Sequence, residues 1–395
     1  VLPSTLSRAS WVAVIIGSLF VIVHSYNIRK WYSDLTRNKL LKGALLVASV
    51  TIFVTTTFGI YNLKKDSADG RLLMWKISAQ QIANNPLLGS GINKFTHAFG
   101  NQQAQYFHSH EFDEKEALVA GKGEYAFNEF LKIGVEHGLI GIVFFLTIII
   151  CALQVSFANY SNSKMIVATS GSLISLLVFS LFSYPFSMTP LLLNLFFFLC
   201  IISALSPNNF NVRIGRGSRI ILFILIFLGC PFILKMQLNK YQIMQEWKVA
   251  SLLSSNSSYK EAIEIMNKIE PELCYRGDFM LDYGQILAIN ENYVRAIRVL
   301  KQASNLTSDP YLFNSLGQCY QALKMYEEAE LCYLHAYYLI PHKFYPRYLL
   351  VKLYEERGDL ASAKILAMKV KKMYIKVKSK AIDEILKEMD RVINL

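Results

Sequence analysis

The chain has 395 residues, of which 53% are hydrophobic and 18% charged, and its formal net charge is +12. Long apolar runs fill the sequence up to about Leu238, and the charge density rises beyond it. This division indicates a membrane protein with a soluble C-terminal domain. The basic residues are not interleaved with stacking aromatic residues in a groove-like pattern, so no nucleic-acid partner is predicted.

Six apolar runs approach the ~20 residues that a helix needs to cross ~30 Å of hydrocarbon. They cover residues 6–23, 41–60, 139–158, 165–182, 189–205 and 220–234. The sequence therefore predicts about six transmembrane helices, the second of which is the weakest because it carries four threonines. The first run follows Val1 almost at once, which indicates a fragment that lacks upstream helices.

The basic gaps between these runs all fall on one side of the predicted membrane. Lysine and arginine gather at residues 29–42, at Lys164 and at residues 213–219, whereas the opposite gaps are mixed in sign or uncharged. Because cytoplasmic loops carry the excess of basic residues, the long loop 61–138 and the C-terminal domain are expected outside the cytoplasm. A disulfide is permitted there, although Cys274, Cys319 and Cys332 leave one cysteine odd.

The long outer loop carries an amphipathic helix that begins near Arg71 and stops at the stretch "NNPLLGSG". A guanidinium at that point suits a bidentate grip on phosphate. The stretch "YFHSHEFDE" brings His108 and His110 close to Glu111 and Asp113, but no second cluster completes a tetrahedral set. No metal site is therefore predicted in the loop.

The C-terminal part, residues 239–395, reads as an array of about four tetratricopeptide repeats with a capping helix at Lys380–Asn394. One unit matches the 34-residue helix–turn–helix pattern closely. Its matching positions are Leu316, Gly317, Tyr320, Ala329, Tyr333, Ala336 and Pro341. The small residues allow two helices to approach, the tyrosines fill the space between them, and the proline ends the second helix. Such arrays usually bind a peptide or protein on a concave face.

Taken together, residues 2–205 resemble the core of the O-antigen ligase and polymerase superfamily. The matching residues are Arg71, Trp75, Asn85, Pro86, Leu87, Leu88, Gly89, Gly91, Asn128, Leu131, Glu136, Gly138 and Gly141, and "TLSRAS" at residues 5–10 resembles the Ser-Arg signature that opens a helix in these proteins. Members with a C-terminal tetratricopeptide domain fit the whole chain. The predicted fold is thus all-α, with a polytopic transmembrane domain over residues 1–238 followed by an α-solenoid over residues 239–395.

The resemblance implies a multi-pass enzyme of the bacterial inner membrane, with the long loop and the repeats in the periplasm. Such enzymes transfer a glycan from undecaprenyl diphosphate to lipid A core, to a growing polysaccharide or to a protein hydroxyl, and they generally need no metal, nucleotide or other cofactor. Arginines are expected to hold the diphosphate, and the matching positions are Arg8 and Arg71. Fixed cations in a site shielded from water stabilise the charge that develops on a leaving group.

In many of these ligases a histidine before the motif asparagine is a candidate for activating the acceptor, but here that position is Phe127. Phenylalanine neither accepts nor donates a proton. The site could act through positioning and leaving-group stabilisation alone, through another base, or could bind the glycan without turnover. The expected catalytic residues are Arg71, Arg8, Glu136 and His137, and the expected substrate-binding residues are Asn128, Trp75, Glu124 and Lys132.

Each of these residues has a simpler interpretation. Asn128 could cap a helical turn, Glu136 and His137 could anchor a helix at the interface, and Arg8 could reach the lipid head groups. Gly138 and Gly141 are expected to be packing residues between helices. At the level of the whole chain, the alternative to a transferase is a non-catalytic scaffold that binds an envelope protein through its repeats, and the sequence does not separate ligase, polymerase and protein glycosyltransferase.

Overall fold

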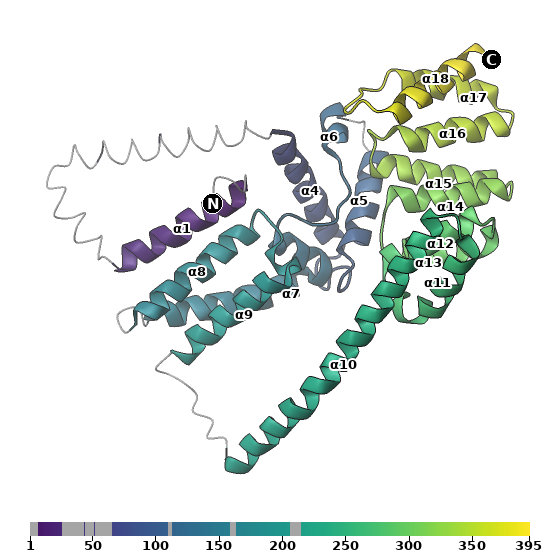
Figure 1. The fold of residues 1–395 in the computed structure, drawn as a ribbon. Helices are drawn as coiled ribbons and strands as arrows, with labels where there is room; N and C mark the ends of the chain where they lie inside the picture. Colours follow the sequence, from purple (N-terminus) through teal and green to yellow (C-terminus); the bar gives the residue numbers. More distant parts are fainter. Residues whose placement is uncertain are drawn as a thin grey trace. The chain divides into compact units, whose positions relative to one another are not determined.

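The computed structural model describes residues 7–25, 43, 51, 65–109, 113–158, 163–205 and 215–395. All the regular elements in this part of the chain are helical, which confirms the all-α prediction (Figure 1). The chain forms two compact units. Unit 1 comprises Val1–Phe95 and Gly123–Phe210, and unit 2 comprises Thr96–Lys122 and Asn211–Leu395. The domain boundary expected at residue 238 stays a prediction.

Unit 1 is built from helices that pack through small residues. Its described elements are α1 (Arg8–Ser25), α4 (Lys65–Asn84), α7 (Glu129–Ala158), α8 (Lys164–Ser180), the 3-10 turn η2 (Pro185–Ser187) and α9 (Thr189–Ala204). Helices α1 and α8 approach so closely that a Cβ atom on Gly17 would lie 2.7 Å from the Gly171 carbonyl oxygen. The hydroxyl of Ser175 on α8 donates to the Ala13 carbonyl of α1 at 2.9 Å.

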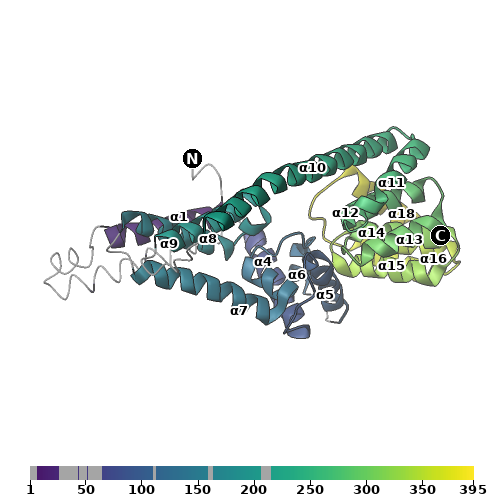
Figure 2. The same ribbon diagram turned by 90° about the horizontal axis from the view of Figure 1, so that it is seen from below.

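Two described helices, α1 and α7, are long and apolar enough to cross a membrane, and α8 and α9 are apolar but shorter. The expected bundle of about six spans is therefore not confirmed. Apart from Gly43 and Thr51, the span expected over residues 41–60 lies outside the described residues. The one expected over residues 220–234 is part of α10 (Arg216–Ser255), a single long helix of unit 2 (Figure 2).

Helix α7 is broken at Gly138, where φ is 65°, a value that L side chains rarely adopt. The break leaves backbone groups that the turn after α4 satisfies. Ser90 and Gly91 donate their N–H groups to carbonyls of α7 at 2.8 and 2.9 Å, and Leu139 donates its N–H to Pro86 at 2.8 Å. The stretch "NPLLGSG" and Gly138 therefore form one interlocked feature, in which Gly138 breaks α7 and packs against a turn rather than in the contact between two helices that was expected.

Unit 2 consists of stacked antiparallel helix pairs, joined by two helices of the long outer loop (Figure 1). Its elements are α5 (Phe95–Ser109), α6 (Glu114–Val119), α10, α11 (Tyr259–Leu273), α12 (Gly277–Ile289), α13 (Tyr293–Ser304), α14 (Pro310–Ala322), α15 (Tyr326–Leu339), α16 (Phe344–Glu356), α17 (Leu360–Lys371) and α18 (Lys380–Asn394). The predicted helical repeats are present, and α18 has the bounds predicted for the capping helix.

The repeats pack through the small residues that the period singles out. A Cβ atom on Gly317 would lie 2.4 Å from the Tyr333 ring, and one on Gly284 would lie 2.5 Å from Leu300, so these glycines set the distance between paired helices. Tyr333 is fully buried. Cys274, Cys319 and Cys332 are free thiols. Burial raises the pKa of Cys319 to about 11, so the thiol is inert at neutral pH.

Helix α5 of the outer loop packs onto the repeats within unit 2. A Cβ atom on Gly100 would lie 2.4 Å from the Ser308 Cβ, and the Ser308 hydroxyl donates to the Asn101 side chain at 3.2 Å. The buried Gln103 amide donates to the carbonyls of Leu339 and Gly121. Part of the loop predicted to carry the glycan site is thus a structural element of the repeat unit.

Candidate functional site

Arg71 and Arg8 of unit 1 lie close together. Arg71 is on the second turn of α4, and its guanidinium carbon lies 5.0 Å from the centre of the Phe127 ring, a cation–π contact. Burial lowers the pKa of Arg71, and the neighbouring charge of Arg8 lowers it further. Arginine nevertheless stays protonated. The partly desolvated Arg71 and the neighbouring charge of Arg8 form a place where a dianion would be stabilised.

Three aromatic side chains, Tyr125, Phe127 and Tyr184, pack together beside Arg71, and they are called the aromatic wall. The rings of Tyr125 and Tyr184 are stacked, with centroids 3.9 Å apart and planes 10° apart. Phe127 meets the Tyr184 ring edge-on at 5.3 Å. Tyr184 also lies near Arg71. The sequence analysis missed both tyrosines, although "FSYPFSMTP" between two apolar runs carried a signal in its Tyr and Pro residues.

The N-terminus of α7 fixes the position of this wall. Asn128 accepts the N–H groups of Phe130 and Leu131 at 3.0 and 3.1 Å, so it caps the helix, which is the simpler interpretation weighed for it. Glu129 is 2% exposed and accepts the Phe186 N–H at 2.7 Å. The Glu129 contact holds α7 and the η2 turn together, and η2 directly follows Tyr184.

Lys132 supports the same junction, since its ammonium donates to the Ser187 hydroxyl at 3.1 Å. Trp75 lies one turn after Arg71 on α4, with its ring 6.2 Å from that of Phe182 and its Nε1 buried without a hydrogen-bond partner in the described part of the chain. Glu124 is exposed. The structure thus brings Lys132 and Trp75 to the elements that carry the arginine and tyrosines.

Glu136 and His137 lie instead at the break in α7. Glu136 is 7% exposed and accepts the Phe95 N–H at 3.3 Å. His137 Nδ1 is buried, and no described group hydrogen-bonds to it. Among the described residues, no hydrogen bond or ring contact joins either side chain to Arg71. A role in catalysis for these two residues stays a prediction.

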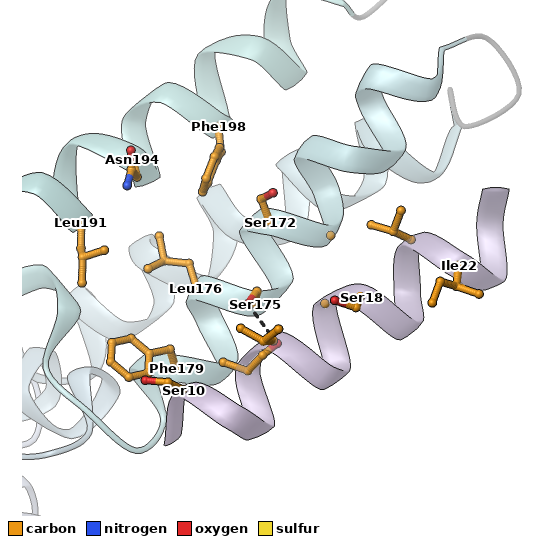
Figure 3. A pocket seen from close by; sticks show the side chains of 15 residues that line it. Ser10, Ser18, Ile22, Ser172, Ser175, Leu176, Phe179, Leu191, Asn194 and Phe198 are labelled. Carbon is orange, nitrogen blue, oxygen red and sulfur yellow. Dashed lines mark hydrogen bonds between the residues drawn. The ribbon is translucent and has the colours of Figure 1, made fainter. Parts of the chain in front are cut away.

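A groove of about 690 Å³ runs along α1 and is bordered by α8 and α9 (Figure 3). Its lining is mostly apolar, with Ser10, Ser175 and Asn194 among its few polar side chains. Ser10 and Phe179 lie at one end and Ile22 at the other (Figure 3). Twelve helical residues separate Ser10 from Ile22, a length of about 18 Å. Arg8 is two residues before Ser10 and so lies near the same end of α1, although neither Arg8 nor Arg71 lines the groove.

The described residues contain no group of histidine, cysteine and acidic side chains that could hold a metal ion. Of the histidine-rich stretch weighed in the loop, His110 and Glu111 lie outside the described residues.

These features define a helical unit with two helices long and apolar enough to cross a membrane and an apolar groove, in the same chain as a helical-repeat unit. Residues 1–146 match the family model described as O-antigen ligase. The match agrees with the family resemblance that the sequence carries. The match ends within α7, so α8 and α9, which complete the groove, lie beyond it.

Comparison with solved structures gives the crystal structure of yeast Tom70, which covers 97% of this chain and 95% of that chain with 11% sequence identity and a TM-score of 0.34. A search of curated proteins gives no match.

Proposed function

We propose that unit 1 transfers a glycan from an undecaprenyl-diphosphate carrier to an acceptor, in the manner of an O-antigen ligase or polymerase. The O-antigen ligase domain in residues 1–146 supports glycosyl transfer of this general type. The observation that carries the finer proposal is the proximity of Arg8 and Arg71, with Arg8 two residues before the groove-lining Ser10. The groove suits an isoprenoid chain, and the arginines suit a diphosphate.

The transfer would require little covalent chemistry from the protein. An acceptor hydroxyl attacks the anomeric carbon of the glycan, a new C–O bond forms, and the bond to the diphosphate breaks with its electron pair leaving on phosphate oxygen. Arg8 and Arg71 would stabilise the charge that develops there. The hydroxyl gives up its proton, which Phe127 cannot accept. Glu124 is exposed and lies three residues before Phe127, so it remains a candidate base, beside Glu136 and His137.

The aromatic wall would position the sugar. Stacked Tyr125 and Tyr184 offer flat apolar faces and hydroxyl groups next to Arg71. A reactant held in the right geometry gains a large part of the rate from positioning alone. The lipid bilayer and the carrier lipid are the expected partners on one side, and the acceptor would be lipid A core, a polysaccharide or a protein on the periplasmic side of the bacterial inner membrane.

The proposal is tested by complementation of a host from which the gene has been deleted, with envelope glycans and glycoproteins resolved on a gel. Arg71→Ala is expected to lose the ladder or band that the wild type restores, and Arg71→Lys to restore it only partly because an ammonium lacks the bidentate fork. Arg298→Ala, an exposed arginine of α13, is the matched control and should restore fully. Full restoration by Arg71→Ala would refute the proposed site.

One observation favours a second function, a non-catalytic scaffold. Phe127 occupies the position of the expected histidine and packs on Arg71, so the arginine is already engaged by a ring. A scaffold predicts that Arg8 and Arg71 variants restore the envelope profile while deletion of residues 242–395 abolishes it. The same gel therefore separates the two functions.

A further inference from the structure

Unit 2 contains a second cavity, of about 1160 Å³, that is independent of the groove in unit 1. It lies against α12, α14, the start of α16, and α18, and residues 119–122 of the outer loop form one of its walls. These four residues are called the strap. The cavity is thus bordered by the repeats together with a segment from a distant part of the sequence.

The strap and the residues before it are held in place by four contacts within unit 2. Lys122 pairs with the buried Asp309 at 2.8 Å. His342 Nδ1 donates to the Ala117 carbonyl at 3.0 Å, and the Lys376 ammonium donates to the Leu118 carbonyl at 2.9 Å. In the fourth contact, the Gln103 amide donates to the Gly121 carbonyl of the strap at 3.1 Å. This wall is therefore built into the unit.

The lining contains a buried polar atom without a partner. Asn314 of α14 is 4% exposed, and no group of the described chain hydrogen-bonds to its Oδ1. A buried carbonyl oxygen is costly to leave unpaired, so this atom is suited to an N–H donor from a ligand. Nearby, the Gln285 amide donates to the Ser315 hydroxyl at 3.1 Å, which leaves its own oxygen as a further acceptor.

The basic side chains around the cavity favour a ligand that carries negative charge. Lys343 and Lys376 line it, and its one acidic lining residue, Asp309, is neutralised by Lys122. The adjoining segment from Lys364 to Lys380 contains seven lysines and no acidic residue. Lys343 is exposed at the start of α16. A ligand with carboxylate groups complements this border.

We propose that the cavity bordered by the strap binds an extended polypeptide segment that combines aliphatic and acidic side chains. The aliphatic lining at Ile289, Ile382 and Ile385 suits aliphatic side chains better than the hydroxylated face of a sugar. A backbone N–H of the segment satisfies Asn314, and its carboxylates lie at Lys343 and Lys376. This inference does not depend on the glycosyl transfer proposed for unit 1, because the cavity lies wholly in unit 2.

The test presents the full-length protein, in detergent, to an array of randomised ten-residue peptides. Bound peptides should be enriched in Asp or Glu next to Leu, Ile or Val. For the strongest binder, measured by fluorescence anisotropy, Lys343→Glu should weaken binding at least tenfold, and so should Asn314→Leu, which removes the acceptor at similar volume. Lys260→Glu, an exposed lysine of α11 away from the cavity, should leave it unchanged.

Three results would overturn the inference. The array could show no enrichment, or could enrich neutral or basic peptides. The three variants could bind the peptide equally, which would place binding elsewhere. Acidic oligogalacturonate, tested as a second probe, could bind to the wild type and lose that binding in Lys343→Glu, while the acidic peptides do not bind. That result would assign the cavity to a glycan.

Discussion

Arg71 lies beneath the ring of Phe127, with its guanidinium carbon 5.0 Å from the ring centre, so the residue that replaces the expected histidine touches the arginine directly. Phe127 adopts this position with φ of 49°, an uncommon value for a non-glycine residue. Strained backbone of this kind persists only where surrounding contacts hold it. The ring therefore orients the cation that the proposed chemistry requires.

Phe127→Ala is expected to lower glycan transfer roughly 2- to 30-fold, the range that corresponds to the loss of one cation–π contact. Phe127→Tyr keeps the aromatic face and should retain most of the activity. Transfer is measured as the rate at which the lipid-linked glycan is consumed by membranes that contain equal amounts of each variant. Equal activity of the alanine and tyrosine variants would show that the ring does not orient Arg71.

The sequence predicts those parts of this molecule whose signal is local. The repeats follow from a short period in which Gly317 and Tyr333 are neighbours in one helical pair. The capping role of Asn128, which was weighed beside glycan contact, likewise involves only residues within three positions of it along the chain. In each case the residues that interact belong to one supersecondary unit.

The parts that were not predicted depend on contacts between distant segments. Glu129 meets Phe186 across 57 positions, which is why the tyrosine wall was missed. Gln103 meets Leu339 across 236 positions, so a helix of the outer loop belongs to the repeat unit. No pattern of hydrophobicity specifies such a pairing. The Arg8–Arg71 proximity was reached through family resemblance, since periodicity alone does not bring these two residues together.

Gly138→Ala is expected to destabilise unit 1 strongly. The new Cβ would lie 2.2 Å from the Leu87 carbonyl oxygen, and φ is 65°, so steric overlap adds to a left-handed backbone penalty of about 1–2 kcal/mol. The folded fraction is measured by size-exclusion chromatography after heating in detergent. Gly229→Ala is the control, because a Cβ there meets nothing within 4 Å, and it should be neutral or slightly stabilising. Equal heat resistance of the two variants would contradict the interlocked break in α7.

Gly100→Ala should loosen α5 from the repeats, because its Cβ would lie 2.4 Å from the Ser308 Cβ. The expected result is faster hydrogen exchange in α5 and the strap, with α17 and α18 unchanged. Adding Ser308→Gly removes the opposing atoms and should restore most of the protection. If the single variant keeps wild-type exchange in α5, the helix is not docked at that point.

Acid is expected to destabilise the repeat unit through His335. Burial, with a smaller effect from His97, lowers the pKa of His335 to about 4, and its Nε2 has no hydrogen-bond partner among the described residues. Below the unfolded pKa of about 6.5 the unfolded chain binds a proton that the folded unit does not, so stability falls as pH drops from 6.5 towards 4. The loss is on the order of 1–3 kcal/mol.

His335→Phe and His335→Gln both remove this titration, and His342, whose pKa burial also lowers, keeps part of the pH response. The measurement is hydrogen exchange of the α14 and α15 amides in the full chain at pH 7 and pH 5, each referred to its intrinsic rate. Both variants should lose less protection at pH 5 than the wild type does, in spite of their different polarity. If both variants lose as much protection at pH 5 as the wild type does, other groups drive the acid response. If only His335→Phe differs from the wild type, the effect comes from packing against Phe313, whose ring centre lies 4.0 Å from that of His335.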